Sequence, residues 1–182
     1  MLSDLHITAD WTLFLDRDGV INHEKKEDYI RNWAEFIFYT ESLTALPLLA
    51  QKFSRIIIVT NQKGIGKGWM TDTDLALIHQ HMTHQIIELG GRIDAIFYCS
   101  DLDNASFNRK PQPGMAFQAK EQFPLIDFSK SIMVGNRMSD MEFGRNAGMH
   151  TVYLATTNPE APFPDTKIDH RYDNLSQFAQ AI

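Results

Sequence analysis

Short apolar runs alternate with longer amphipathic stretches along most of this chain. The apolar runs predict strands at Trp11–Leu15, Arg55–Val59, Ile93–Tyr98, Ser131–Val134 and Thr151–Leu154. The amphipathic stretches predict helices at Ser42–Phe53, Thr73–Leu89, Met115–Gln122, Ser139–Ala147 and Leu175–Ile182. Strands that alternate with helices pair in parallel through right-handed crossovers. We therefore expect an α/β fold, in which a three-layer, Rossmann-like arrangement surrounds a parallel sheet.

One segment, Gly19–Thr40, does not follow this alternation. It ends in the aromatic-rich stretch Trp33–Tyr39, which is more typical of a small hairpin or flap than of a crossover helix. The chain has no internal repeat and no stretch with the composition of an interdomain linker. The sequence thus predicts a single domain over residues 1–182, without a large cap domain.

Composition and charge narrow the class of protein. The 182 residues are 43% hydrophobic and 22% charged, which is typical of a soluble globular protein, and the formal net charge of -6 argues against a nucleic-acid partner. Cys99 is the single cysteine, no apolar run approaches the ~20 residues of a membrane span, and the first residues lack the pattern of a signal peptide. We expect a cytoplasmic protein without a membrane partner, and the sequence leaves monomer and dimer open.

Two carboxylates follow the first predicted strand directly. Asp16 and Asp18 belong to an Asp-x-Asp-Gly sequence, at the place where a parallel sheet opens its binding crevice. One carboxylate is a candidate nucleophile and the other a candidate acid, and a hard cation can bind between them. This pair is the strongest chemical signal in the chain.

The second predicted strand also ends in polar residues, Thr60 and Asn61, which precede a glycine turn. A hydroxyl at a strand end, followed by backbone amides, is suited to phosphate oxygens, although the same residues also occur as ordinary turn caps. The glycines that follow match neither the dinucleotide-binding nor the P-loop spacing.

Two later segments carry further candidates. Arg109 and Lys110 precede a Pro-x-Pro-Gly sequence that restrains them, and a solvated basic turn is the alternative. Asn136 follows the fourth strand, and Asp140 lies in the first turn of the next helix, where a carboxylate is also favoured by the helix dipole alone.

Taken together and in this order, the four segments resemble the haloacid dehalogenase superfamily of phosphohydrolases. Asp16-Arg-Asp-Gly-Val-Ile-Asn22, Thr60-Asn-Gln62, Arg109-Lys-Pro-Gln-Pro-Gly-Met115 and Gly135–Asp140 are similar to the branch that contains heptose-bisphosphate phosphatases and histidinol-phosphatase domains. The resemblance covers nearly the whole chain. It implies a phosphatase that hydrolyses a small phosphorylated metabolite, such as a sugar or heptose phosphate.

The resemblance also implies roles for the catalytic residues. Asp16 would be the nucleophile that forms an aspartyl-phosphate, and Asp18 would be the acid and then the base. Thr60 and the Asn61 amide would bind phosphoryl oxygens, and Lys110 would neutralise their charge.

A magnesium ion is the cofactor implied by the same resemblance. Mg²⁺ would contact the Asp16 carboxylate, the Asp18 main-chain carbonyl and the Asn136 side chain, with Asp140 supporting from nearby. Arg109 would reach the substrate beside the phosphate.

The chain departs from the family pattern in two places. The family has Asp where this chain has Asn136, so we expect weaker metal binding because the site loses one negative charge. The zinc loop of the heptose-phosphatase branch is reduced here to Cys99, so we expect no zinc. His79, His81 and His84 do not have metal-site spacing, and we expect them at surface or helix-packing positions.

Two other functions remain as alternatives. The first is a non-catalytic descendant that binds a phosphometabolite or a protein, which Asn136 favours. The second is a receiver-like domain that is phosphorylated on aspartate. The Asp-x-Asp and Arg-Lys-Pro segments of this chain fit the hydrolase pattern better than the receiver pattern.

Overall fold

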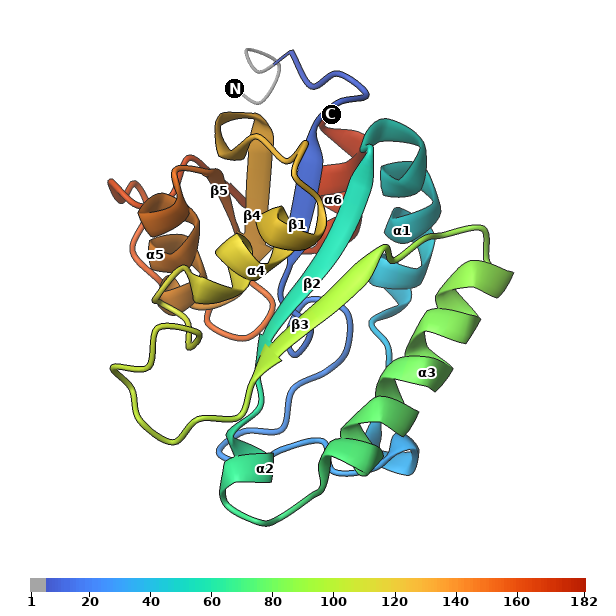
Figure 1. The fold of residues 1–182 in the computed structure, drawn as a ribbon. Helices are drawn as coiled ribbons and strands as arrows, with labels where there is room; N and C mark the ends of the chain where they lie inside the picture. Colours follow the sequence, from blue (N-terminus) through green and yellow to red (C-terminus); the bar gives the residue numbers. More distant parts are fainter. Residues whose placement is uncertain (1–5) are drawn as a thin grey trace.

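A twisted parallel sheet forms the centre of the computed structural model, which describes residues 6–182 (Figure 1). Within these residues the sheet has six strands in the order β3-β2-β1-β4-β5-β6, and every neighbouring pair is parallel. The strands are β1 (Thr12–Leu15), β2 (Arg55–Asn61), β3 (Ala95–Cys99), β4 (Ser131–Gly135), β5 (His150–Leu154) and β6 (His170–Tyr172). This order places β1 between β2 and β4 in the middle of the sheet.

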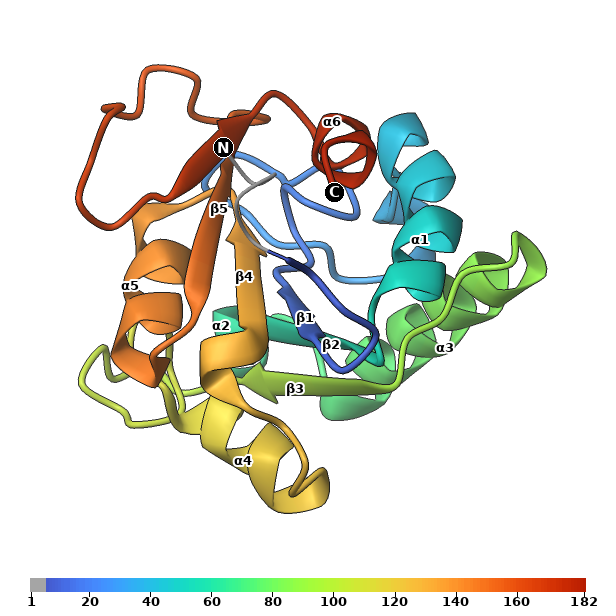
Figure 2. The same cartoon turned by 90° about the horizontal axis from the view of Figure 1, so that it is seen from above.

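Helices cover both faces of the sheet (Figure 2). On one face lie α1 (Thr40–Lys52), α3 (Asp72–Glu88) and α6 (Leu175–Gln180), and on the other lie α4 (Gly114–Gln122) and α5 (Met138–Ala147). The short α2 (Lys63–Gly66) follows β2, and Trp33–Glu35 and Phe128–Lys130 form 3-10 turns. The expected three-layer α/β arrangement is therefore confirmed.

The alternation of side chains along the strands builds two buried cores. Leu13 and Leu15 of β1 belong to the core formed with α1, α3 and α6, whereas Phe14 belongs to the core formed with α4 and α5. Successive strand residues point to opposite faces, and β1 is buried on both. This explains why its sequence reads as a continuous apolar run rather than as an alternating one.

Two local predictions were incomplete. The edge strand β6 was not expected, because its sequence His-Arg-Tyr is short and polar. The segment Gly19–Thr40 is not a regular hairpin; it contains one isolated antiparallel bridge, between Asn22 and Phe38, and a 3-10 turn. Within residues 6–182, no helix has the length and apolar character needed to cross a membrane.

The sheet register brings the polar segments together. Leu15, the last residue of β1, pairs with Ile58 of β2 and with Val134 of β4. The residues that follow these positions leave the sheet at the same edge, which is where open parallel sheets bind their ligands.

Candidate active site

Asp16 is buried directly beyond the end of β1. Its backbone N–H donates to Val134 O over 3.0 Å, which continues the pairing with β4 by one residue. Its Oδ1 accepts a hydrogen bond of 2.8 Å from the Arg17 N–H and lies 2.9 Å from Lys110 Nζ. Within the described chain these contacts are made at Oδ1, so Oδ2 is the oxygen available for attack.

Lys110 connects three of the elements around the site. Its buried ammonium group lies 2.9 Å from Asp16 Oδ1 and 2.7 Å from Asp140 Oδ1, and it donates to Val59 O over 2.9 Å. The side chain of Asn61 holds the backbone on either side of this lysine: Lys110 N donates to Asn61 Oδ1 at 3.1 Å, and Asn61 Nδ2 donates to Lys110 O at 3.0 Å. Lys110 is therefore held in place both at its ammonium group and at its backbone.

The cluster of Asp16, Asp140 and Lys110 contains two acidic side chains and one basic side chain. Burial raises the pKa of Asp16 to about 7 despite the nearby ammonium of Lys110, and the carboxylate of Asp140 adds to the increase. Burial lowers the pKa of Lys110, but the two carboxylates outweigh it and the pKa is raised overall. One buried cation shared by two buried carboxylates leaves the site able to accept a second positive charge.

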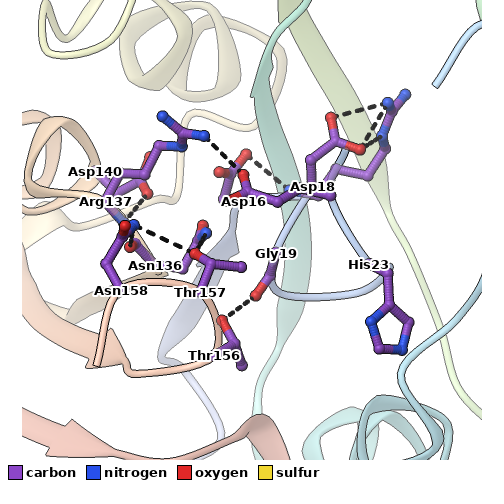
Figure 3. Close-up of polar contacts among 12 residues, drawn as sticks. Asp16, Asp18, Gly19, His23, Asn136, Arg137, Asp140, Thr156, Thr157 and Asn158 are labelled. Atoms are coloured by element: carbon purple, nitrogen blue, oxygen red, sulfur yellow. Dashed lines mark hydrogen bonds and ion pairs between the residues drawn. The ribbon is translucent and has the colours of Figure 1, made fainter. Parts of the chain in front are cut away.

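Asp18 is held by three neighbouring side chains. Arg17 Nη2 donates to both carboxylate oxygens at 2.9 Å, and Asn22 Nδ2 and Gln62 Nε2 each donate over 2.9 Å. Burial opposes ionisation, but the Arg17 charge and these hydrogen bonds together lower the pKa of Asp18. The carboxylate form is thus favoured in this arrangement, and Asp18 has to take up a proton before it can serve as an acid. The Asp16 and Asp18 side chains leave the same loop in different directions (Figure 3).

Gln62 links the second predicted segment to the first. Its Nε2 donates to Thr60 Oγ1 at 2.9 Å as well as to Asp18, and both Thr60 and Gln62 are buried. Sequence reasoning placed Thr60 at the site but gave Gln62 no role. The available signal was its position two residues after Thr60, in the turn that leaves the same strand.

Asn136 is buried against the loop that carries the two aspartates. Its Nδ2 donates to Thr157 Oγ1 over 2.6 Å, whereas its Oδ1 is buried and has no hydrogen-bond partner among residues 6–182. Gly19 makes the approach possible: its φ is +85°, and a Cβ atom there would lie 2.0 Å from Asn136 Nδ2. Figure 3 shows the amide between Thr157 and this loop.

The oxygen atoms at this position suit a magnesium ion. Mg²⁺ prefers hard oxygen ligands, and the buried Asn136 Oδ1 lacks the partner that such an atom ordinarily has. Within residues 6–182 no three His, Cys, Asp or Glu side chains are grouped to hold a metal. Ligation by protein would therefore combine the Asp16 carboxylate with amide and main-chain oxygens.

Asp140 lies in the first turn of α5. Its Oδ2 accepts from the Arg137 N–H at 3.0 Å, while Oδ1 lies against Lys110. Gly135 permits this approach, because a Cβ atom there would be 2.2 Å from Asp140 Cβ. The carboxylate thus caps the helix and fixes the lysine at the same time.

The structure brings most of the predicted site residues together around Asp16 and Asp18. Lys110 contacts Asp16 directly and links it to Asp140, and the side chain of Asn61 holds the backbone of Lys110. Thr60 is linked to Asp18 through Gln62, and Asn136 packs against Gly19 of the same loop. Arg109 is half-buried, and its Nη1 donates to Asp101 O at 3.5 Å, in the loop that follows β3.

A parallel sheet with this constellation at its carboxyl edge defines a phosphatase of the haloacid dehalogenase type, and comparisons with known proteins agree. The family model described as "Polynucleotide kinase 3 phosphatase" matches residues 10–168. The chain therefore belongs to this family of the haloacid dehalogenase superfamily, and it is a phosphatase.

Curated relatives within the superfamily are heptose-bisphosphate phosphatases. The chain is 34% identical over 173 residues to D-glycero-alpha-D-manno-heptose-1,7-bisphosphate 7-phosphatase of Mycobacterium bovis, covering 94% of this chain and 91% of the relative. It is 35% identical over 142 residues to the enzyme of the same name from Campylobacter jejuni, covering 78% and 80%. A crystal structure of D,D-heptose 1.7-bisphosphate phosphatase from B. bronchiseptica, complexed with magnesium and phosphate, has a TM-score of 0.85 and 26% identity over 94% of this chain and 97% of that one.

Proposed function

We propose that this phosphatase hydrolyses the phosphomonoester of a small phosphorylated sugar, with Asp16 as the nucleophile. The observation that carries the proposal is the position of Lys110, which lies within 2.9 Å of the Asp16 carboxylate and is buried with it. A phosphate dianion repels a carboxylate nucleophile, so a fixed cation beside the attacking group is what the reaction requires.

Two displacements at phosphorus complete the reaction. In the first, which requires Asp18 in its protonated form, Asp16 Oδ2 attacks phosphorus, the bond to the sugar oxygen breaks, and that oxygen takes the proton from Asp18. In the second, Asp18 accepts a proton from water, the water oxygen attacks phosphorus, and the bond to Asp16 breaks. Inorganic phosphate leaves, and both aspartates return to their initial state.

Three further residues handle the phosphate and the substrate. We assign the Thr60 hydroxyl to a phosphoryl oxygen, because it lies at the end of β2 and is linked to Asp18 through Gln62. The side chain of Asn61 is engaged with Lys110, so its backbone N–H is the group assigned to the phosphoryl oxygens. Arg109, which directly precedes Lys110 in the chain, is assigned to the part of the substrate beside the phosphate.

Mg²⁺ is the cofactor of this proposal. The ion would be held by three oxygen ligands, from the Asp16 carboxylate, the Asp18 main chain and Asn136 Oδ1. Asp140, which is paired with Lys110, would support these ligands from nearby. When bound, the ion supplies a second positive charge that offsets the charge on the transferred phosphoryl group.

The substrate proposal rests on the relatives. They are named for heptose 1,7-bisphosphate, and the magnesium and phosphate in the B. bronchiseptica structure agree with the cofactor and product proposed here. We therefore propose a heptose phosphate as the substrate. The single cysteine, Cys99, supports a reducing cytoplasmic location.

The test is steady-state hydrolysis of a panel of phosphates with Mg²⁺. The panel contains heptose 1,7-bisphosphate, hexose phosphates, histidinol phosphate and a 3′-phosphorylated oligonucleotide. We expect turnover of the heptose compound, and we expect Asp16→Asn to abolish it.

The matched control is Asp10→Asn, which removes an exposed carboxylate just before β1. This variant should retain the wild-type rate. Binding of sugar phosphate without turnover would contradict the proposal and favour a non-catalytic descendant. A preference for the oligonucleotide would contradict the sugar-phosphate assignment.

A further inference from the structure

His79, in the second turn of α3, contacts the first catalytic loop. Its Nε2 lies 3.1 Å from Arg17 Nη1, although the two residues are 62 positions apart in the sequence. The sequence indicated only surface or helix packing for this histidine. The structure instead places it against a fully buried arginine.

The chemistry of the pair fixes which atom donates. A guanidinium group can only donate hydrogen bonds, so His79 Nε2 must accept, and the ring proton must be on Nδ1. Burial, and then the charge of Arg17, lowers the pKa of His79 to about 3, so the ring is neutral near pH 7. His79 thus serves as a neutral acceptor for one end of the guanidinium group.

The other end of Arg17 holds Asp18. Arg17 Nε donates to Asp18 Oδ1 at 3.2 Å, and Nη2 donates to both carboxylate oxygens at 2.9 Å. The guanidinium carbon also lies 5.9 Å from the centroid of the Phe36 ring. Because the guanidinium group is planar and rigid, fixing Nη1 fixes the direction of the side that faces Asp18.

We propose that His79 is a positioning residue that orients the acid/base Asp18 through Arg17. The inference rests on the proposed function, in which Asp18 gives its proton to the departing sugar oxygen. Removal of His79 would leave a buried N–H of Arg17 without its acceptor, and the arginine would turn to find another partner. Asp18 would then keep its hydrogen bonds from Asn22 and Gln62 but lose the bidentate contact with Arg17, which orients its carboxylate.

The dependence on the leaving group tests this role directly. A sugar alkoxide needs a proton as it departs, whereas nitrophenolate leaves without one. The ratio kcat/KM reports the steps up to transfer of the phosphoryl group to Asp16. A general loss of folded enzyme or of phosphate binding lowers this ratio for both substrates equally, but a misplaced acid lowers it for the sugar phosphate alone.

The experiment compares heptose 1,7-bisphosphate with p-nitrophenyl phosphate in four variants. We expect His79→Leu to lower kcat/KM for the sugar phosphate about 10-fold or more, and to lower it for p-nitrophenyl phosphate much less. His79→Gln should restore much of the loss, because its Oε1 can accept from Arg17. His84→Leu, an exposed histidine on the same helix, is the control and should behave as the wild type.

Asp18→Asn is the fourth variant and distinguishes two kinds of failure. If Asp18→Asn loses activity equally on both substrates, the proposed function of Asp18 fails, and this inference fails with it. If Asp18→Asn is selective but His79→Leu is unchanged or equally impaired on both substrates, the proposed function stands and the inference is overturned. Circular dichroism of each variant confirms that the comparison is made on folded protein.

Discussion

Thr157 Oγ1 accepts a hydrogen bond of 2.6 Å from Asn136 Nδ2. This contact decides which end of the Asn136 amide is free, because nitrogen is directed to the threonine and oxygen is left without a partner within residues 6–182. An amide presents a ligand oxygen only in one of its two orientations, whereas a carboxylate has an oxygen at both positions. The loop after β5 therefore orients the amide of Asn136.

The first prediction concerns the charge of the proposed metal site. Asn136→Asp should lower the Mg²⁺ concentration that gives half-maximal turnover, because a carboxylate adds one negative charge beside the ion. Calorimetric titration of Mg²⁺ into the same variant should show tighter binding. An unchanged or weaker metal dependence would count against Asn136 as a ligand.

The second prediction concerns the orientation of the amide. Thr157→Val removes the acceptor and should weaken Mg²⁺ binding in the wild-type background. In an Asn136→Asp background the same substitution should have a much smaller effect, because the carboxylate needs no such orientation. Thr166→Val, at an exposed position on the same connection, is the control. Equal effects of Thr157→Val in both backgrounds would show that the threonine does not act through the amide.

The third prediction concerns the buried cation. Lys110→Met should abolish turnover and lower the free energy of unfolding by about 3–5 kcal/mol, because it leaves two buried carboxylates without their partner. Urea denaturation measures the loss. Adding Asp140→Asn to Lys110→Met should recover part of the stability but none of the activity. A double variant less stable than Lys110→Met would contradict this account of the charges.

The fourth prediction uses two glycines to separate backbone strain from close approach. Gly19 and Gly68 have φ values of +85° and +70°, but only a Cβ at Gly19 would meet a neighbouring atom within 4 Å. Gly68→Ala should cost about 1 kcal/mol of stability from strain alone. Gly19→Ala should cost more and should also weaken Mg²⁺ binding, because it displaces Asn136. Similar losses in both variants would indicate that the contact with Asn136 has no role.

The fifth prediction concerns the acid stability of the folded protein. The pKa of His79 is lowered from 6.5 to about 3 by burial, so the unfolded chain binds a proton that the folded chain does not. The stabilising effect is complete above pH 6.5 and is lost as the pH falls toward 3. At pH 5 the loss is about 2 kcal/mol. His79→Gln has no imidazole to protonate. Between pH 7 and pH 5 the unfolding free energy of this variant should therefore fall by about 2 kcal/mol less than that of the wild type. Urea denaturation at pH 7 and at pH 5 would measure the difference.

The sequence predicted the parts of the fold that depend on local pattern. Continuous apolar runs and the alternation of strands with helices were sufficient for the parallel sheet, and the sheet explains why Asp16, Thr60 and Asn136 lie at one edge. The strand β6 escaped prediction because three residues, His170–Tyr172, carry too little pattern.

The supporting contacts could not be predicted in the same way. His79 reaches Arg17 across 62 residues, and Thr157 reaches Asn136 across 21, through the packing of a helix and a loop. Neither residue belongs to a motif with its partner. A single histidine on a helix and a single threonine in a loop have the same sequence signal whether or not they support a site.

The site can form only late in folding. Its groups come from the ends of β1, β2 and β4 and from the segment around Lys110, so they meet only after strands more than 100 residues apart have paired. Such long-range pairing is slow compared with the formation of a helix. Recovery of phosphatase activity during refolding will therefore follow the docking of β4 against β1, and will lag behind the return of helical signal.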